Sequence, residues 1–302
     1  TDVTIVGGGV AGLSVAYWLS RKNPKLKVAL VEKQTLGAGA SGRNAGFVTC
    51  GSAEHFNRMV ERWGITKALE VWNFSEENLR LLKEEILEGN EKELLFEQKG
   101  SLSLCSEKKE LEELKKSYEI MHENHLNVDM VSQSFLKEQG LEGFCGGIHY
   151  KDDGSIDPIK LLMSLQEKVK KHVDIYENCE VYEIEKGGDE RFVLTSKGDF
   201  ESSIVIFATN AYSSLIHPYF KNLITPTRGQ ILSLKATKRI LEIPCYAHSV
   251  LDYFRQIPTG EFLIGGFRHL AIDTEKGFSD EISDVIQKAL EKFITTHLPA
   301  LK

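Results

Sequence analysis

The sequence predicts an α/β protein whose two domains are each assembled from separated stretches of its 302 residues. The chain begins with an apolar strand, a glycine-rich turn and a helix, and a second apolar strand follows over residues 28–31. This order is typical of a parallel sheet covered by helices. A later apolar segment, residues 203–208, is typical of a strand buried on both faces. From about Leu223 onward, short alternating segments predict antiparallel strands and therefore a second, mixed sheet.

Three glycines in the first turn, Gly7, Gly9 and Gly12, have the spacing of a dinucleotide-binding motif. Gly7 is expected to turn the chain out of the strand, Gly9 to let a pyrophosphate approach the backbone, and Gly12 to let the helix pack closely on the sheet. The helix, expected over residues 12–21, offers an anion its free N–H groups and the positive end of its dipole. Glu32 follows the next strand, about 20 residues beyond Gly12, where such sites place the acidic residue that holds the ribose hydroxyls. These features together favour a Rossmann-like site over an ordinary glycine turn.

A second loop of small residues follows over residues 37–48. Small residues let a flat ring or a phosphate lie against the backbone, whose N–H groups then face the ligand. Ser41, Arg43 and Asn44 add side-chain donors to this loop. A flexible linker would seldom carry Arg-Asn and return at once to apolar Phe47, so we interpret the segment as a ligand-binding loop.

The remaining sequence alternates between helical and strand patterns. Further helices are expected over residues 53–88, 106–124, 158–169 and 279–297. Residues 94–104 predict a hairpin, or two strand segments around a glycine turn. Other strands are expected over residues 144–150, 173–176, 180–184, 191–195, 227–235, 246–257 and 261–267. Asp157 and Pro158 suit the start of a helix. Ala208 and Thr209 follow an apolar strand at its carboxyl end, where open α/β sheets bind ligands.

These elements fall into alternating blocks along the chain. Parallel-type elements occupy residues 1–88 and 151–217, and mixed strands occupy residues 89–150 and 218–302. We interpret the first pair of blocks as a dinucleotide-binding domain and the second pair as a substrate domain.

Composition excludes several classes of function. The net charge of -7 argues against a general nucleic-acid or anionic-membrane binder. No apolar run approaches the roughly 20 residues needed to span a bilayer, and the chain starts directly on its first strand, so no signal peptide is expected before it. The five cysteines have neither a C-x-x-C nor a zinc-like spacing. We therefore expect free thiols, no metal site and a cytoplasmic location.

Taken together, the motifs resemble the FAD-dependent D-amino acid oxidase superfamily, near glycine oxidase, sarcosine oxidase and related amine and amino acid oxidoreductases. The resemblance covers essentially the whole chain. It rests on six motifs in order: the first glycine motif with Glu32, then residues 39–46, 154–158, 206–211, 226–230 and 262–266.

The resemblance implies that FAD binds in an extended form, with contacts that run from the pyrophosphate to the ring and to the adenine. These contacts are Val10 and Ala11 at the pyrophosphate, Glu32 and Lys33 at the adenosine ribose, Ala40 and Ser41 along the diphosphate, Asn44, Ala45, Gly46 and Phe47 at the isoalloxazine, and Val181 at the adenine. Arg43 is a further candidate near the flavin.

The implied chemistry is hydride transfer from the carbon next to a substrate amine to flavin N5, followed by hydrolysis of the imine to an oxo acid or aldehyde. Electrons then pass to oxygen, giving hydrogen peroxide, or to another acceptor. The substrate is expected to be a small amine or amino acid. Arg255 and Arg268 are candidates to hold a carboxylate bidentately, with a surface or strand-end charge as the alternative for each. Tyr253 is a candidate for the pocket wall.

Family members normally continue beyond the final helix with a strand pair, a Gly-rich loop near the flavin ring and a last helix, and this segment is missing after Lys302. Two other functions remain alternatives. A nicotinamide-dependent dehydrogenase shares the first glycine motif, but the second small-residue loop and the Asp157-Pro158 block disfavour it. A non-catalytic flavin-binding subunit is the other. Substrate identity, electron acceptor, covalent attachment of flavin and oligomeric state are left open.

Overall fold

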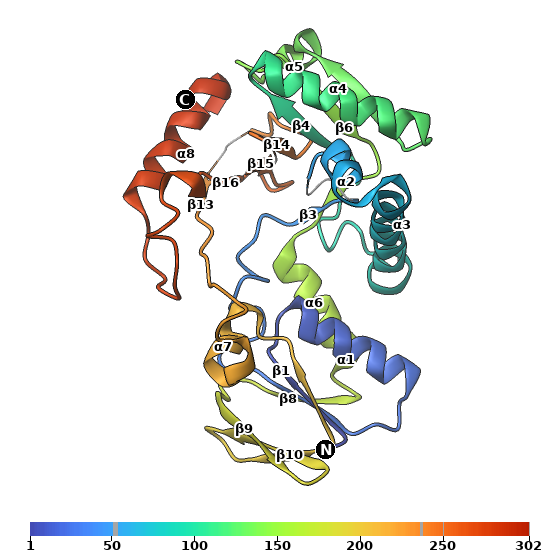
Figure 1. Ribbon diagram of the computed structural model, residues 1–302, viewed down its shortest axis with the longest axis vertical. Helices are drawn as coiled ribbons and strands as arrows, with labels where there is room; N and C mark the ends of the chain where they lie inside the picture. Colours follow the sequence, from blue (N-terminus) through green and yellow to red (C-terminus); the bar gives the residue numbers. More distant parts are fainter. Residues whose placement is uncertain (51–53, 236–237, 250, 302) are drawn as a thin grey trace. The chain divides into compact units, whose positions relative to one another are not determined.

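The computed structural model describes residues 1–50, 54–235, 238–249 and 251–301 (Figure 1). Contacts separate the chain into two units, each built from three stretches. Unit 1 comprises residues 1–44, 158–228 and 276–278, and unit 2 comprises residues 45–157, 229–275 and 279–302. Both units are therefore discontinuous in sequence. Their boundaries differ from the predicted blocks mainly at residues 45–88, which the contacts group with unit 2.

Unit 1 is built on a four-stranded parallel sheet in the order β12-β1-β2-β8. Its strands are β1 (Val3–Val6), β2 (Val28–Val31), β8 (Val173–Tyr176) and β12 (Ile204–Phe207). The helices α1 (Val10–Lys22) and α6 (Pro158–Val169) pack beside each other on this unit (Figure 1). Every residue of β1 and β2 is buried, as expected of central strands between two neighbours. The glycine turn therefore leaves the middle of the sheet.

The last strand of this sheet departs from its prediction. Residues 203–208 were expected to be buried on both faces, but β12 pairs with β1 alone among the described strands and lies at the edge. Ile204, the first residue of β12, is 54% exposed, and the other three residues of the strand are only partly buried. An apolar composition predicts a strand, but it does not reveal how many neighbours that strand has.

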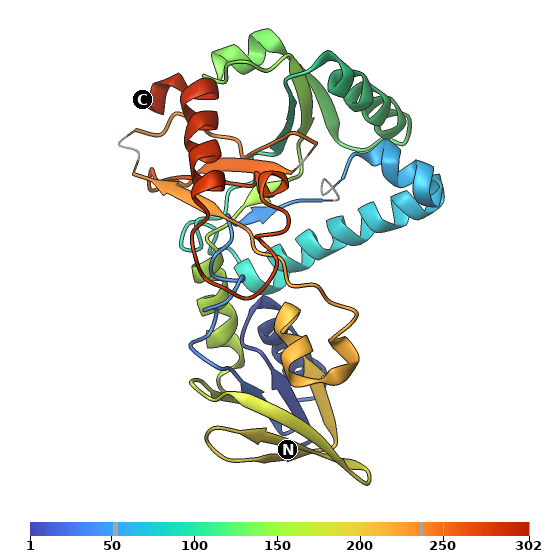
Figure 2. The same cartoon turned by 60° about the vertical axis from the view of Figure 1, so that its left-hand side comes forward.

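A smaller antiparallel sheet completes unit 1 (Figure 2). It contains β9 (Val181–Gly187), β10 (Glu190–Thr195) and β11 (Phe200–Ser202). After β12 the chain makes short helical turns, which include α7 (Ser213–Ile216).

Unit 2 is built on a seven-stranded mixed sheet in the order β13-β16-β15-β14-β4-β6-β5. Its strands are β4 (Ser101–Cys105), β5 (Val128–Ser132), β6 (Gly146–Tyr150), β13 (Ile231–Leu234), β14 (Cys245–Ala247), β15 (Asp252–Gln256) and β16 (Phe262–Gly265). Only the β14–β4 pair is parallel among these strands. The sheet confirms the predicted α/β class with a second, mixed sheet.

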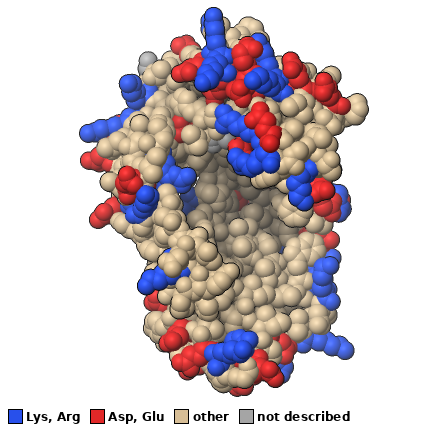
Figure 3. Space-filling view, in the orientation of Figure 1, with Lys and Arg blue, Asp and Glu red and all other residues tan. Residues whose placement is uncertain are grey.

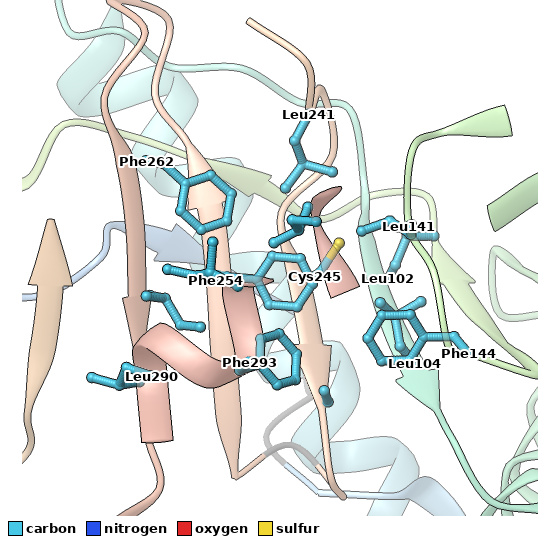
Figure 4. Close-up of a cluster of buried hydrophobic side chains, with 14 of the residues drawn as sticks. Leu102, Leu104, Leu141, Phe144, Leu241, Cys245, Phe254, Phe262, Leu290 and Phe293 are labelled. Atoms are coloured by element: carbon cyan, nitrogen blue, oxygen red, sulfur yellow. The ribbon is translucent and has the colours of Figure 1, made fainter. Parts of the chain in front are cut away.

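One large core packs this sheet against α8 (Asp284–His297). Figure 4 shows the rings of Phe254, Phe262 and Phe293 together between the strands and the helix. Phe254 is fully buried, and its ring centroid lies 5.4 Å from that of Phe293. Removing these apolar side chains from water is the main stabilising contribution in unit 2.

The predicted helix over residues 53–88 is interrupted in the structure. It consists of α2 (Phe56–Trp63), α3 (Ile65–Leu81) and a π-helical segment (Leu82–Leu87), and residue 53 lies outside the described residues. Gly64 separates the first two helices with a φ of +80°, a conformation that favours glycine. The other helices of unit 2 are α4 (Lys108–Glu123) and α5 (Gln133–Glu138).

Two strand predictions in unit 2 differ from the structure. Residues 94–104 do not form a hairpin: of the two predicted alternatives, extended segments on either side of Gly100 are closer, with Glu97 in a bridge to Ser155 and β4 after the glycine. Residues 246–257 form two antiparallel strands, β14 and β15, because His248 and Ser249 adopt positive φ angles and the chain reverses between the strands. Residue 250 of that segment lies outside the described residues.

Candidate functional site

In unit 1 the two predicted loops meet and are bonded to each other. The first loop, residues 7–12, links β1 to α1. The second loop, predicted over residues 37–48, follows β2, and its residues up to 44 belong to unit 1. The N–H of Gly37 donates to the carbonyl oxygen of Gly8 at 3.0 Å. The N–H of Val10 donates to the hydroxyl oxygen of Ser41 at 2.9 Å. The sequence predicted both loops, and the structure joins them into one surface at the carboxyl end of β1.

The glycines of the first loop are sterically required. Gly7 has a φ of +109°, and a β-carbon there would lie 2.6 Å from the carbonyl oxygen of Ala208. A β-carbon at Gly12 would lie 1.9 Å from the carbonyl oxygen of Gly7. At Gly9 it would lie 2.7 Å from the Ser41 hydroxyl, and would fill the space between the two loops. The loop therefore keeps its backbone bare where the loops meet.

The start of α1 is open and has no acidic side chain. Val10 and Ala11 are exposed, and no Asp or Glu lies in the first turn of this 13-residue helix. Arg21 and Lys22 lie in its last turn, where cations suit the negative end of the dipole. The positive end is thus available to an anion, as the motif predicts.

Glu32 is fixed at the end of β2 by the loop backbone. Its Oε2 accepts a hydrogen bond from the N–H of Gly8 at 2.7 Å, and its Oε1 accepts one from the N–H of Gln34 at 2.9 Å. A carboxylate has about four acceptor sites, so this geometry leaves capacity for a diol. The side chain is only half-buried.

The segment just before Val181 is joined to the end of β2 by two contacts, and the sequence predicted neither of them. The ammonium of Lys33 lies 2.8 Å from the carboxylate of Glu180, and this hydrogen bond raises the pKa of Lys33. Val181 is the next residue and begins β9. The N–H of Cys179 donates to the carbonyl oxygen of Glu32 at 2.8 Å. The only sequence signal for Glu180 was its place beside Val181.

The end of the second loop is closed by its own side chains. The Asn44 amide donates to the carbonyl oxygens of Ser41, at 2.7 Å, and Ala40, at 3.1 Å. The N–H of Arg43 also donates to Ala40, at 3.3 Å. Ala40, Arg43 and Asn44 are exposed. The loop is therefore a defined turn rather than an extended linker.

In unit 2 the chain continues from Ala45 into a two-residue strand, β3 (Phe47–Val48), which pairs with β7 (Gly154–Ser155). Arg255 on β15 lies against the start of this ribbon. Its Nη1 donates to the carbonyl oxygens of Gly46, at 2.9 Å, and Ile156, at 3.1 Å. Burial lowers the pKa of Arg255 to about 10. Arg255, predicted as a candidate substrate contact, is thus a buried donor to the main chain.

Three aromatic side chains gather at the same ribbon. The ring of Phe47 lies 4.7 Å from that of Tyr246 and 5.9 Å from that of Tyr253, centroid to centroid. Tyr246 was missed from the sequence, although it faces Tyr253 as a cross-strand neighbour between β14 and β15. Burial raises the pKa of Tyr253. A β-carbon at Gly265 would lie 2.4 Å from the Tyr253 hydroxyl, so this glycine leaves space for the ring.

Arg268 lies in a short helical turn, Arg268–Leu270, directly after Phe267. It is exposed, unlike Arg255. Its positive charge opposes the burial that raises the pKa of Tyr253, so the guanidinium acts electrostatically on that hydroxyl. The structure therefore gives the two candidate arginines different surroundings.

In Figure 3, acidic and basic side chains are mixed with each other along the margins of the face drawn. Among the described residues, no helix has the length and apolarity needed to cross a membrane. In that same part of the chain, no cluster of three or more His, Cys, Asp or Glu residues could hold a metal ion.

The chain is similar to known proteins over most of its length. The family model described as "FAD dependent oxidoreductase" matches residues 2–302. A probable oxidoreductase, OrdL, of Haemophilus influenzae is 28% identical over 87% of this chain and 64% of its own length. Glycine oxidase of Geobacillus kaustophilus is 24% identical over 82% of this chain and 64% of its own length. The chain thus spans 64% of the length of each of these relatives.

The fold is also found among solved structures. The crystal structure of glycine oxidase from Bacillus cereus has a TM-score of 0.82 at 22% identity. The match covers 99% of this chain and 78% of that one. This likeness confirms the predicted Rossmann-like fold with a mixed second sheet.

Proposed function

Because this chain belongs to the family of FAD-dependent oxidoreductases, we propose that it binds FAD in an extended form and oxidises the C–N bond of an amino acid or a secondary amine. The observation that carries the proposal is the joined pair of loops in unit 1. They provide an open helix N-terminus, a bare glycine backbone and a carboxylate at the end of β2. We further assign the adenine dinucleotide part of FAD to unit 1, and the ring contacts at Gly46 and Phe47 together with the substrate to unit 2.

The residues of unit 1 fit an adenine dinucleotide. The N-terminus of α1 at Val10 and Ala11 suits the pyrophosphate, since its N–H groups and dipole favour an anion. The hydroxyl of Ser41 lies beside Val10 and can follow the diphosphate. The carboxylate of Glu32, already oriented by Gly8, suits the ribose diol. Ala208, whose carbonyl oxygen faces Gly7, and its neighbour Thr209 border the same turn.

In unit 2, the turn at Gly46 and Phe47 would present the ring-binding surface. FAD supplies the hydride acceptor in this family. The chain's own contribution is to orient the substrate and exclude water, for which Phe47 and Tyr253 supply an apolar wall. Arg268 is the better candidate for a substrate carboxylate, because Arg255 is buried and already donates to two carbonyl oxygens.

We also propose a cytoplasmic location. All five cysteines are free thiols. Cys105 and Cys145, whose sulfur atoms lie 3.5 Å apart, are joined by a hydrogen bond and not by a disulfide. Free thiols in contact suit a reducing compartment.

Absorbance and turnover of the purified protein test the proposal. Absorption bands near ~370 and ~450 nm, before or after reconstitution with FAD, are expected of a bound flavin. Peroxide release or dye reduction is then measured with D-amino acids, glycine, sarcosine and polyamine derivatives, and turnover of at least one is expected. A colourless protein that takes up NADH would reverse the assignment in favour of a nicotinamide-dependent dehydrogenase. Bound flavin without turnover of any substrate would favour a non-catalytic flavin-binding subunit.

A further inference from the structure

Among the described residues, Arg255 is the only lysine or arginine that is buried. It is 1% exposed and lies within β15, between β14 and β16. Side chains alternate along a strand, so Arg255 shares a face with Tyr253, while Phe254 enters the core beneath α8. A cation buried in this way costs free energy unless its surroundings compensate it. Its position therefore needs a physical reason.

The two carbonyl oxygens that Arg255 binds lie at one end of the short ribbon: Gly46 directly precedes β3, and Ile156 directly follows β7. Nη1 reaches Gly46 and Ile156, and the oxygen of Gly46 also accepts a hydrogen bond from the N–H of Ile156 at 2.8 Å. Beyond this point β3 and β7 pair over two residues each. A ribbon this short has little stability of its own. Arg255 ties its end to the seven-stranded sheet.

Gly46 is packed too closely on its neighbours to carry a side chain. Gly46 has a φ of +70°. A β-carbon there would lie 2.0 Å from the carbonyl oxygen of Ile156 and 3.1 Å from Nη1 of Arg255. The backbone of Gly46 therefore packs directly on the guanidinium, and displacing one would displace the other.

The charge of Arg255 is only partly balanced. Burial lowers its pKa, and the nearby carboxylates of Glu97 and Asp157 raise it. Glu97 is itself bonded to Arg239, whose Nη1 lies 2.8 Å from its Oε1. Nε and Nη2 of Arg255 are buried and have no hydrogen-bond partner among the described residues. The guanidinium thus keeps its charge next to Gly46 without a carboxylate bonded to it.

We propose that Arg255 is a positioning residue that fixes the turn at Gly46 and, through it, the ring of Phe47 where the flavin is to bind. This inference rests on the proposed function, since only FAD binding gives the turn its purpose. It also removes Arg255 from the substrate contacts.

Four forms of the protein test the inference: wild type, Arg255→Met, Arg255→Lys and the control Arg239→Met. Arg239 is another cation of unit 2, bonded to Glu97 rather than to the turn. Losing charge-assisted hydrogen bonds to two carbonyls should weaken FAD binding about tenfold or more in Arg255→Met. The absorption and visible circular dichroism of the remaining bound flavin should change. Arg255→Lys should recover part of both properties, and Arg239→Met should keep the wild-type spectrum.

Amide hydrogen exchange without FAD gives a second readout. The N–H of Ile156, which donates to Gly46, should exchange faster in Arg255→Lys than in wild type, while amides of β4 should not change. This measurement keeps the inference testable if Arg255→Met fails to fold.

The failures of the two proposals are distinct. Wild-type protein that refuses FAD would overturn the proposed function and this inference with it. Wild-type protein that binds FAD, with Arg255→Met equal to it in affinity and spectrum, would overturn only the role of Arg255. Lower thermal stability in both Met variants, with unchanged flavin spectra, would reduce Arg255 to a structural residue and also overturn it.

Discussion

A β-carbon at Gly12 would lie 1.9 Å from the carbonyl oxygen of Gly7, closer than any allowed contact. Gly12→Ala should therefore push α1 away from the turn and cost about 1–3 kcal/mol, as overpacking does. FAD affinity should fall as well, because the displaced helix carries the anion site. Thermal unfolding and FAD titration measure the two effects.

Gly39→Ala is the matched control, since a β-carbon there meets no atom within 4 Å. It should change the unfolding free energy by no more than about 0.5 kcal/mol. Equal losses in both variants would show that the contact between Gly12 and Gly7 is not what limits this position.

Glu32 allows a second prediction about a single residue. Glu32→Gln keeps the size of the side chain but removes the charge, and its amide would turn a donor toward the N–H of Gly8 or Gln34. Hydrogen bonds to a charged group contribute about 1.5–3 kcal/mol, so FAD affinity should fall at least about tenfold. Isothermal titration with FAD measures this.

Glu180→Gln serves as the comparison for Glu32→Gln. It removes the exposed partner of Lys33, and exposed ion pairs contribute only about 0–1 kcal/mol. Its effect on FAD affinity should stay within a few-fold. If Glu32→Gln binds FAD as tightly as Glu180→Gln, the ribose role of Glu32 is wrong.

At the level of single elements, the sequence predicted where the chain is helical or extended better than what each element contacts. The first helix was expected over residues 12–21 and is Val10–Lys22. The strand at 173–176 is β8. Residues 94–104, by contrast, carry a strand pattern, but Glu97 exchanges backbone hydrogen bonds with Ser155 and not across a hairpin. Pairing of distant strands is non-local, so local patterns do not determine it.

In the candidate site, too, the features that depend on local sequence were predictable and those that depend on distant segments were not. Loop positions such as Gly12 and Glu32 were predictable because their motif lies within one strand–helix–strand unit. Tyr246 and the role of Arg255 were not, because both depend on segments about 100 or more residues away in sequence, joined only by the sheet of unit 2. The alternation that predicted Arg255 in a strand does not show whether the guanidinium is buried against the main chain or exposed at the surface.

The start of α2 gives a pH-dependent prediction. His55 precedes this helix and is 1% exposed, and neither ring nitrogen has a hydrogen-bond partner among the described residues. Burial, helped by Arg58, lowers the pKa of His55 from 6.5 to about 4. The folded state therefore prefers the neutral ring, so His55 costs no stability above pH 6.5 and reduces stability as the pH falls from 6.5 toward 4.

The pKa is lower by about 2.5 units, so at about 1.4 kcal/mol per unit the loss should reach at most about 3.5 kcal/mol, less any screening by solvent. Denaturant unfolding of wild type and His55→Phe between pH 7 and 5 measures it. The two curves should diverge from each other as the pH falls, with the wild type losing more. His172 is exposed, so the stability of His172→Asn should change with pH as that of the wild type does. Parallel curves for His55→Phe would contradict the prediction.

At the scale of the whole molecule, the fold class followed from composition blocks, but the limits of the two units did not. Residues 53–88 carry the same helical pattern that a parallel α/β domain would have. Phe56 and Trp72 of this segment, however, belong to one buried cluster with Ile148 of β6. An amphipathic pattern shows that one side of a helix is buried, but it does not show which sheet that side covers. Assignment to unit 2 therefore required the structure.

The separate cores of the two units lead to the last prediction. Phe254 is fully buried, and its contacts with Phe262 and Phe293 lie within unit 2 (Figure 4). Phe254→Ala should cost about 3–5 kcal/mol, because it removes apolar burial and leaves a cavity. Hydrogen exchange should rise most in β15 and β16 and least in β1 and β2, whose buried residues belong to unit 1. Phe74→Ala, at a 76% exposed position on α3, should change neither region. A uniform rise across both sheets after Phe254→Ala would mean that the two units unfold as one.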